Sequence, residues 1–419
     1  MINVSPSLKS GLRTLNILFV IGSILSLNGC GGGAAAGSPA GNPSTPPIVI
    51  SATNVVPIIV GSSAFKDVNL PYVSLSLCAP NDASNCQTID HVLVDTGSVG
   101  LRIFSSALNA SLTLPQKSSA TGSQIAECTH FADGYTWGPL KLADLKIGGE
   151  SVSGMTIQVI SDALFATVPT ACANVGKRIT TPQDFGANGV LGIGLFKQDC
   201  GLACSQSSAN GVYFGCTTKA CAGAALALSE QVQHPVSLFN INNNGVIVSL
   251  AKVNDGGAVS ATGTLTFGIE TQLNNASGSA IAPLNASISA DPATGYITTT
   301  YQQKNYSASF IDTGSNGIFF QDSQIPVCAS GFYCPTAPLS ISALVTGTNG
   351  MSTAVNFSIE NANALFANNS CYFAFSTLAG SASNSNTFDF GLPFFYGKNV
   401  HTVIEGKRTS RGIGPYFSW

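Results

Sequence analysis

Two copies of one short motif constrain this chain more than any other feature. The first copy is VDTGSVGLRI at Val94–Ile103, and the second is IDTGSNGIFF at Ile311–Phe320. Each copy sets an Asp-Thr-Gly-Ser turn after an apolar run that is typical of a buried strand. The aspartates, Asp95 and Asp312, lie in different halves of the chain. The repeat therefore predicts a duplicated fold with one Asp-bearing turn in each half.

A pair of aspartates has a definite chemistry when the fold brings the two together. Two carboxylates held about 3 Å apart cannot both ionise, so the pair keeps one proton over a broad acidic range. The ionised partner can deprotonate a water while the protonated partner hydrogen-bonds the carbonyl under attack. We therefore expect Asp95 and Asp312 to be catalytic residues for acyl hydrolysis, with no metal or other cofactor.

The remaining residues of the two turns are candidates for supporting the aspartate pair. The glycines permit a tight turn with close backbone approach, and the threonine hydroxyls can brace one turn against the other. The serine hydroxyls can hydrogen-bond the outer carboxylate oxygens. These supporting residues are Thr96, Gly97, Ser98, Thr313, Gly314 and Ser315.

One Asp-Thr-Gly-Ser turn alone is ordinary turn chemistry, whereas two copies in the frame apolar-DTGS-x-Gly-apolar are specific. On these motifs the chain resembles the pepsin-like aspartic proteases, and most of all a bacterial, lipoprotein-like branch of that family. Further segments resemble the family in the same order: FADGYTWGPLKLADLKIGG at Phe131–Gly149, NGVLGIG at Asn188–Gly194, HPVSLFNI at His234–Ile241, GTLTFGIET at Gly263–Thr271, FDFGLPFFYGKNVHTVIEG at Phe388–Gly406 and GIGPYF at Gly412–Phe417.

The resemblance implies an all-β, two-lobed fold with the active-site cleft between the lobes. The N-terminal lobe, residues 48–260, would carry the first turn and a flap hairpin, and the C-terminal lobe, residues 261–419, the second turn. The implied protein is a monomeric endopeptidase that binds an extended polypeptide beneath the flap. The alternative is a catalytically silent binding or envelope-assembly lipoprotein, because a fold alone does not establish catalysis.

Three aromatic residues are candidates for the flap: Phe131, Tyr135 and Trp137. Phe131 occupies the position of the family's flap tyrosine but has no hydroxyl. Residues an even number apart on a strand share a face, so we expect Phe131 and Tyr135 to face the aspartates together. Tyr135 would then supply the polar contact. The alternative is a flap that acts through apolar contact alone.

Two charged residues depart from the family pattern. Arg102 stands where the family often has an aromatic residue, and a guanidinium near the pair would favour the ionised carboxylate. The other interpretation is an arginine at a strand edge that points to solvent. Asp389 occupies an apolar position behind the second turn. It is either a hydrogen-bonded structural carboxylate or an extra acid coupled to the site.

The N-terminus has the features of a targeting segment. Lys9 and Arg13 precede an apolar stretch, Leu15–Leu27, which is short for a membrane span. We interpret residues 1–29 as a signal peptide and Cys30 as a lipidated residue, because the preceding residues resemble a bacterial lipobox. Residues 30–47 then form a flexible tether. This predicts a protein anchored in the bacterial cell envelope, at the outer membrane. The alternative is an ordinary signal peptide.

The chain has 12 cysteines, and 11 remain when Cys30 is set aside. Closely spaced partners predict the disulfides Cys78–Cys86 and Cys328–Cys334, with further pairing within the cluster at residues 200–221. One of the other cysteines, 128, 172 and 371, should then be free. A zinc site in the cluster, within a metal-stapled structural lipoprotein, is the rival interpretation, although the spacing is poor for zinc.

Composition excludes one class of partner. Charged residues make up 9% of the 419 residues, against about 25% in an average soluble domain. The net charge is −3, and no run of Lys and Arg occurs. Nucleic acid is therefore not expected to bind.

The lipid anchor can be tested by one substitution. Cys30→Ser should move the protein from the membrane fraction to the soluble fraction or block its processing, because the acyl chains expected at a lipoprotein cysteine hold it firmly. Fractionation followed by immunoblotting measures this. An unchanged membrane fraction would rule out an anchor at Cys30.

Overall fold

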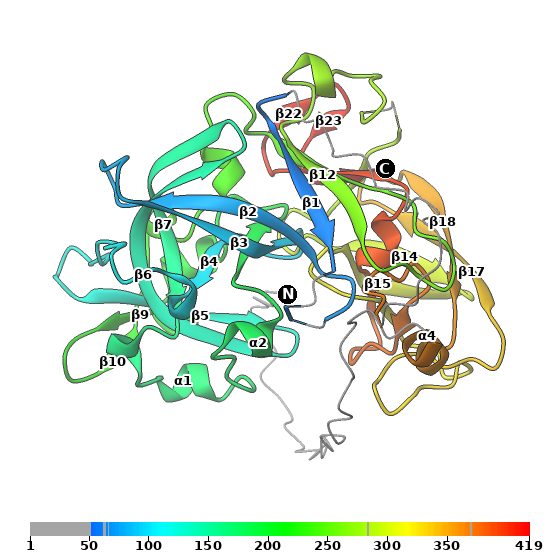
Figure 1. Ribbon diagram of the computed structural model, residues 1–419, viewed down its shortest axis with the longest axis horizontal. Helices are drawn as coiled ribbons and strands as arrows, with labels where there is room; N and C mark the ends of the chain where they lie inside the picture. The colour runs from blue at the N-terminus through cyan, green and yellow to red at the C-terminus, as the bar shows by residue number, and fades with distance from the viewer. Residues whose placement is uncertain (1–51, 62–63, 66, 283–284, 369–370) are drawn as a thin grey trace, which may run out of the picture.

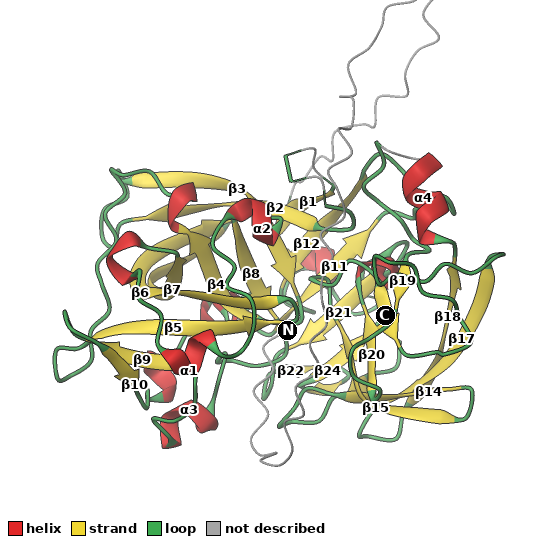
Figure 2. Cartoon of the chain, turned by 90° about the horizontal axis from the view of Figure 1, so that it is seen from below, coloured by secondary structure: helices red, strands yellow, loops and turns green. Residues whose placement is uncertain are grey.

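The computed structural model describes residues 52–61, 64–65, 67–282, 285–368 and 371–419. The predicted signal peptide, Cys30 and the tether lie outside the described residues. Strands dominate the described chain and the helices are short, which confirms the all-β class. In Figures 1 and 2, most strands of the first half of the sequence gather on one side and strands of residues 297–359 on the other.

The largest sheet has 15 strands and contains both early and late parts of the chain. Its strands, in spatial order, are β10 (Cys221–Gly223), β9 (Tyr213–Cys216), β5 (Gln124–Phe131), β6 (Gly134–Ile147), β7 (Glu150–Ile160), β4 (Val99–Phe104), β8 (Gly189–Ile193), β3 (Cys86–Asp95), β2 (Pro71–Cys78), β1 (Val55–Val60), β12 (Ala261–Phe267), β11 (Gly245–Leu250), β21 (Asn399–Val403), β24 (Tyr416–Ser418) and β13 (Ile288–Ser289). The predicted lobe boundary between residues 260 and 261 falls at the start of β12, inside this sheet, where β12 pairs with β1.

A second sheet has seven strands: β18 (Ser352–Ile359), β17 (Leu339–Thr346), β14 (Ile297–Tyr301), β15 (Lys304–Ile311), β20 (Thr387–Phe390), β16 (Ile318–Phe320) and β19 (Ala379–Gly380). A third pairs β22 (Arg408–Thr409) with β23 (Gly412–Ile413). In β17 the inward residues Ile341, Ala343 and Val345 are buried and alternate with outward ones. This period of two is what makes the segment a strand with one covered face.

The helices lie in the connections between strands. The α-helices are α1 (Thr170–Ala173), α2 (Pro182–Phe185), α3 (Leu202–Gln206) and α4 (Ala362–Asn368). The 3-10 helices are η1 (Ser105–Ala107), η2 (Ala163–Phe165), η3 (Leu228–Glu230), η4 (Pro235–Leu238), η5 (Leu273–Asn275) and η6 (Leu392–Phe395). Within the described residues, none of the helices is both long enough and apolar enough to span a membrane.

One arrangement of three strands occurs twice, once in each of the two larger sheets. In the first copy β8 lies between β3, to which it is parallel, and β4, to which it is antiparallel. In the second copy β20 lies between the parallel β15 and the antiparallel β16. Each Asp-Thr-Gly-Ser turn joins the two outer strands of its copy. The duplication that the repeated motif predicts is thus present in the strand topology.

Disulfides close several loops. In the described residues the pairs are Cys78–Cys86, Cys128–Cys172, Cys200–Cys204, Cys216–Cys221 and Cys328–Cys334. The two close pairs and the pairing within the 200–221 cluster are confirmed. The zinc interpretation is wrong, because these sulfurs are bonded to one another rather than available as thiolates.

The prediction of one free cysteine is also wrong for the described residues. Cys128 on β5 pairs with Cys172 on α1, and Cys371 is disulfide-bonded as well. The prediction relied on nearness in sequence. Cys128 and Cys172 are 44 residues apart, and only the fold brings them together.

Candidate functional site

The two turns meet where their strands end. Asp95 is the last residue of β3, and Asp312 directly follows β15. In the first copy Val94 pairs with Leu191 of β8, and in the second Ile311 pairs with Phe390 of β20. All four of these apolar residues are buried. The apolar runs before each aspartate therefore anchor the turns in the core at equivalent depth.

Reciprocal hydrogen bonds hold one turn against the other. The backbone N–H of Thr96 donates to Thr313 Oγ1, and that of Thr313 donates to Thr96 Oγ1, both at 3.0 Å. Each hydroxyl also donates across the site, Thr96 to the carbonyl of Ile311 at 3.1 Å and Thr313 to the carbonyl of Val94 at 2.7 Å. These are the bracing contacts that the sequence predicts for the two threonines.

The carboxylates are oriented by their own turns. Asp95 Oδ1 accepts from the N–H of Gly97 at 2.8 Å, and Asp312 Oδ1 accepts from the N–H of Gly314 at 2.7 Å. On the outer side, the Ser98 hydroxyl donates to Asp95 Oδ2, and the Ser315 hydroxyl donates to Asp312 Oδ2 at 2.9 Å. The inner oxygens are thus held by glycine amides and the outer oxygens by serines.

Each turn approaches the opposite carboxylate so closely that only glycine fits. A Cβ at Gly97 would lie 2.6 Å from Cγ of Asp312, and a Cβ at Gly314 would lie 2.7 Å from Oδ1 of Asp95. Real Cβ atoms do not reach such distances without displacing a neighbour. The two aspartates therefore face each other, and a side chain at either glycine would push the pair apart.

The pair has the electrostatics of a coupled acid. Asp95 is 3% exposed and Asp312 is 2% exposed. Burial, and then the negative charge of Asp95, raise the pKa of Asp312 to about 7. A carboxylic acid that keeps its proton in this range beside a second carboxyl group can donate a hydrogen bond to a substrate while its neighbour accepts a proton.

A cavity of about 90 Å³ adjoins the first turn. Its lining combines Thr96–Val99 of that turn with apolar side chains from other parts of the chain, including Leu195, Phe196, Tyr296 and Phe310. Asp199 also lines this cavity, whereas Asp95 and Asp312 do not.

Arg102 is neither next to the aspartates nor at a solvent edge, so both interpretations from sequence are wrong. Its side chain is fully buried and forms ion pairs with Glu127 and with Asp199, the latter at 3.1 Å. It also donates to Thr129 Oγ1 at 2.8 Å and to the carbonyl of Val99 at 2.6 Å. The arginine therefore ties the residue after the first turn to the β5–β6 hairpin.

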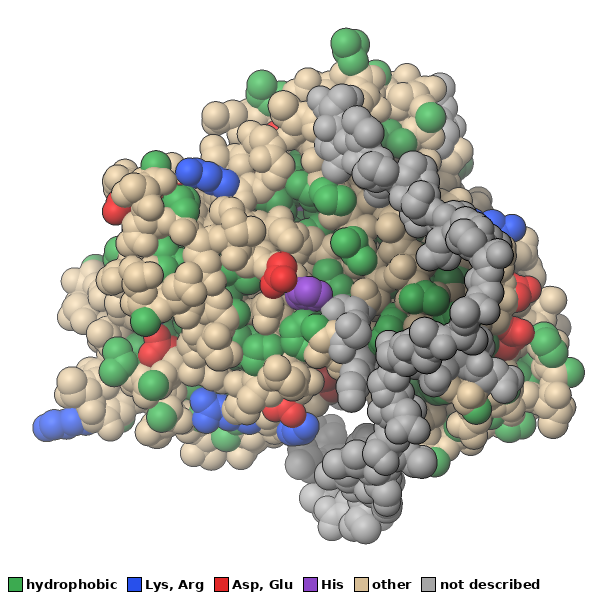
Figure 3. Space-filling model, viewed as in Figure 1, with side chains coloured by type: hydrophobic (Ala, Val, Ile, Leu, Met, Phe, Trp, Pro, Cys, Tyr) green, Lys and Arg blue, Asp and Glu red, His purple; other side chains and the backbone are tan. Residues whose placement is uncertain are grey.

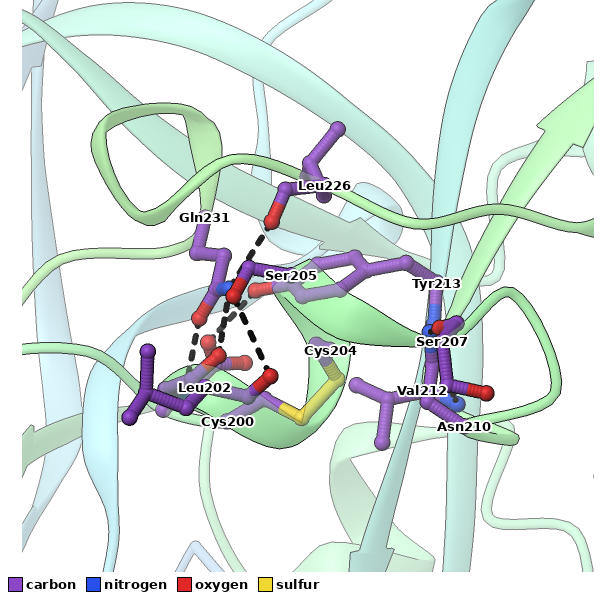
Figure 4. Close-up of a disulfide and its surroundings, with 12 residues drawn as sticks. Cys200, Leu202, Cys204, Ser205, Ser207, Asn210, Val212, Tyr213, Leu226 and Gln231 are labelled. Atoms are coloured by element: carbon purple, nitrogen blue, oxygen red, sulfur yellow. Dashed lines mark hydrogen bonds between the residues drawn. A yellow bond between two sulfur atoms is a disulfide. The ribbon is translucent and has the colours of Figure 1, made fainter.

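Sequence reasoning missed the partners of Arg102. Burial and the charge of Glu127 raise the pKa of Asp199 well above its usual range, and the Tyr213 hydroxyl donates to Asp199. The loop that carries Asp199 continues into the Cys200–Cys204 disulfide, and Gln231 fastens it through hydrogen bonds with Gly201 at 2.7 and 2.8 Å (Figure 4). The signal was an arginine inside an apolar strand, which requires buried acidic partners.

The predicted flap geometry is wrong. The β5–β6 hairpin turns at residues 132–133, so Tyr135 lies opposite His130 and Phe131 lies opposite Gly134. Phe131 and Tyr135 therefore point to different faces. Tyr135 is 4% exposed and belongs to a buried cluster with Trp137. The rule of even spacing failed because it holds along one strand and not across a turn.

The side chains of the other two flap candidates, Trp137 and Phe131, pack against neighbouring parts of the fold. Trp137 is fully buried, and its Nε1–H donates to the carbonyl of Phe165 at 2.9 Å. Phe131 is partly buried and lies edge to face with Phe185 of α2. The hairpin tip is hydrogen-bonded to residues 177–179 through the backbone of Tyr135.

Asp389 lies beside the second turn. It is 5% exposed, and its Oδ1 has no hydrogen-bond partner among the described residues. Burial, and then the charge of Asp312, raise the pKa of Asp389 well above its usual range, while a hydrogen-bonding interaction with Ser315 acts in the opposite direction. Oδ1 thus lacks the hydrogen bond expected of a structural carboxylate, and the effect of Asp312 is in the direction expected of an acid coupled to the site.

Two further observations concern the surface and metals. Charged side chains on the face shown in Figure 3 are scattered among uncharged ones. In the part of the chain that the structure describes, no group of three or more His, Cys, Asp or Glu side chains is arranged to hold a metal ion.

The chain matches a known family of proteins. Residues 50–419 match the model of a family described as a protein of unknown function (DUF3443). The matched range contains both Asp-Thr-Gly-Ser turns and all the residues discussed above. No curated protein matches the chain.

The raised pKa of Asp312 predicts a stability that depends on pH. Above about pH 4 the unfolded chain loses the proton of residue 312, whereas the folded protein keeps it until about pH 7. Wild type should therefore lose stability as the pH rises through this range. Asp312→Asn does not titrate and should raise the free energy of unfolding near pH 7 by about 1–3 kcal/mol, with little effect at pH 4. Chemical denaturation at several pH values measures this.

A matched control lies in an exposed turn of the same half of the chain. Although partial burial acts the other way, hydrogen bonds from Thr294 lower the pKa of Asp291. Asp291→Asn should therefore cost stability near pH 7 and less near pH 3. The same direction of change in both variants would contradict the assignment of a raised pKa to Asp312.

Proposed function

This chain belongs to the family described as proteins of unknown function (DUF3443), and we propose that it is an aspartic endopeptidase with a two-lobed, pepsin-like fold. The observation that carries the proposal is the pair Asp95 and Asp312, held face to face by two equivalent turns. A protein that only binds has no need of two apposed buried acids. Their joint burial costs free energy that a catalytic role would explain.

The mechanism moves two protons, one that Asp312 carries at rest and one that comes from the attacking water. In the resting pair Asp312 carries a proton and Asp95 is ionised. A water between them gives a proton to Asp95 as its oxygen attacks the peptide carbonyl carbon, and Asp312 gives its proton to the carbonyl oxygen. The tetrahedral diol then collapses: Asp95 protonates the leaving nitrogen, Asp312 takes back a proton from one hydroxyl, and the C–N bond breaks. Both acids return to their starting states.

The residues next to the two aspartates hold the carboxyl groups in place. The amides of Gly97 and Gly314 and the hydroxyls of Ser98 and Ser315 hydrogen-bond the carboxyl oxygens of the pair and hold them in a fixed orientation. The substrate is an extended polypeptide, bound by backbone hydrogen bonds as an added strand. The enzyme would work as a monomer that is lipid-anchored in the bacterial cell envelope.

Removal of either acid should abolish proteolysis. Asp95→Asn and Asp312→Asn should each lose at least about a thousandfold in kcat/KM, because an amide cannot exchange the proton that the mechanism moves. The purified protein is tested on an unfolded protein substrate from about pH 3 to 7, with and without a statine inhibitor that mimics the tetrahedral diol.

The control for this test is Asp291→Asn, which should keep wild-type activity because Asp291 lies in an exposed turn. Activity within about tenfold of wild type in Asp95→Asn or Asp312→Asn would contradict the mechanism. A wild type that binds the statine inhibitor but cleaves nothing would favour the silent binding protein instead.

A further inference from the structure

The serine that ends each Asp-Thr-Gly-Ser turn makes the same backbone contact in both copies. The carbonyl of Ser98 accepts from the N–H of Gly194 at 2.8 Å, and the carbonyl of Ser315 accepts from the N–H of Leu392 at 2.7 Å. Gly194 follows β8 and Leu392 follows β20, so each contact is made within its own copy. Up to this point the two turns are supported alike.

The next carbonyl of each turn accepts from a side chain, and here the two copies differ. In the first copy, Arg102 on β4 donates to the carbonyl of Val99 at 2.6 Å. The residue of the second copy at the same distance from its aspartate is Phe319, whose ring has no polar hydrogen to donate. The side-chain amide of Asn69 donates to the carbonyl of Asn316 instead, at 2.8 Å. Asn69 lies just before β2, in the first half of the chain.

The amide of Asn69 is held in one orientation. The residue is fully buried. Its Oδ1 accepts from the N–H of Phe375 at 2.7 Å and from the Tyr396 hydroxyl at 2.8 Å. Its Nδ2 donates to the carbonyl of Phe375 at 2.8 Å as well as to that of Asn316. Both hydrogens and both acceptor positions of the amide are therefore in use.

The backbone at residue 69 also favours asparagine. Its φ is 55°, in the left-handed region that asparagine adopts more readily than most other residues. An aspartate or a leucine of similar shape would have no N–H groups for the two carbonyls that the amide now serves. The position therefore combines a special backbone conformation with a side chain that is fully hydrogen-bonded.

Resting on the proposed function, we propose that Asn69 is a positioning residue for Asp312, which acts by fixing the carbonyl of Asn316 at the end of the second turn. The brace from Thr96 fixes the same turn at Thr313. The first half of the chain thus holds the second turn at two points on either side of its glycine. Movement of the Asp312 carboxyl group away from its partner would have to break one of these two bonds.

The proposal is tested by removing the amide. Asn69→Gly introduces no backbone strain, because glycine adopts a positive φ readily. The variant should lose about ten- to a hundredfold in kcat with KM within about threefold of wild type, because the chemical step depends on the exact position of Asp312. Steady-state kinetics on an unfolded protein substrate measure both constants.

The matched control is Asn244→Gly. The buried amide of Asn244 makes the same pair of bonds with one backbone residue, Ile269, at 2.8 Å each, and also donates to the carbonyl of Arg408. These partners lie outside both turns. Asn244→Gly should therefore lower stability but keep kcat within about twofold of wild type.

A second variant at the same position is Asn69→Ser, which is used if Asn69→Gly does not fold. Its hydroxyl takes the place of Cγ, one bond short of Nδ2, and so does not reach the carbonyl of Asn316. It should show the same loss in kcat. A kcat within about twofold of wild type in a folded Asn69 variant, or an equal loss of kcat in the Asn244 control, would overturn the proposal.

A measurement without substrate distinguishes this proposal from the proposed function. Asp312→Asn should raise the folding constant near pH 7, because burial and then the charge of Asp95 raise the pKa of Asp312. If Asn69 holds the second turn in place, this gain should shrink at least about threefold in the Asn69→Gly background and persist in the Asn244→Gly background. Chemical denaturation at pH 4 and pH 7 follows it.

An unchanged gain in Asn69→Gly would overturn the proposal. A smaller gain there, in a protein without protease activity, would support Asn69 as the residue that positions the second turn and would overturn the endopeptidase assignment.

Discussion

The reciprocal hydrogen bonds between Thr96 and Thr313 are the contact on which the candidate site depends. They join the ends of β3 and β15, which belong to different sheets, and they fix the distance between two buried carboxyl groups. Without this brace the repulsion and desolvation of the acids would favour separation of the turns. The glycines at 97 and 314 then become necessary, because the braced turns leave no space for a Cβ.

A second set of buried charges supports the first turn from behind. Arg102 donates a hydrogen bond to the carbonyl of Val99. It also forms ion pairs with Glu127 of the β5–β6 hairpin and with Asp199 of the loop that precedes α3. His234 adds a neutral contact: burial lowers its pKa to about 4, its Nε2 bonds the Gly194 carbonyl, and the amide of Gly194 donates to Ser98. The first turn is thus positioned from behind by buried side chains, in addition to the brace between the two threonines.

Short sequence patterns predicted the features that depend on a few neighbouring residues. The apolar runs, the turns and the strands behind them follow from patterns of a few residues, and the duplication follows from their repetition. The failures concern relations across the fold. The partners of Arg102 lie 25 and 97 residues away. The faces of Phe131 and Tyr135 depended on a turn at residues 132–133, which lies one residue before the position that the Asp133-Gly134 pair would indicate. Cys128 and Cys172 meet only through the tertiary structure.

The two halves differ in the surroundings of one buried ionisable side chain, Arg102 in the first half and Asp389 in the second. Arg102 pairs with Val190 across β4 and β8, and in the equivalent register Phe319 pairs with Asp389 across β16 and β20. Each half therefore carries one ionisable residue at this pair of positions, on the flanking strand in the first and on the central strand in the second. The charge of Arg102 is compensated by Glu127 of the β5–β6 hairpin and by Asp199 of the loop that precedes α3. No such cation compensates Asp389 among its sheet partners, Phe310 and Phe319, and burial raises the pKa of its carboxyl group well above the usual range.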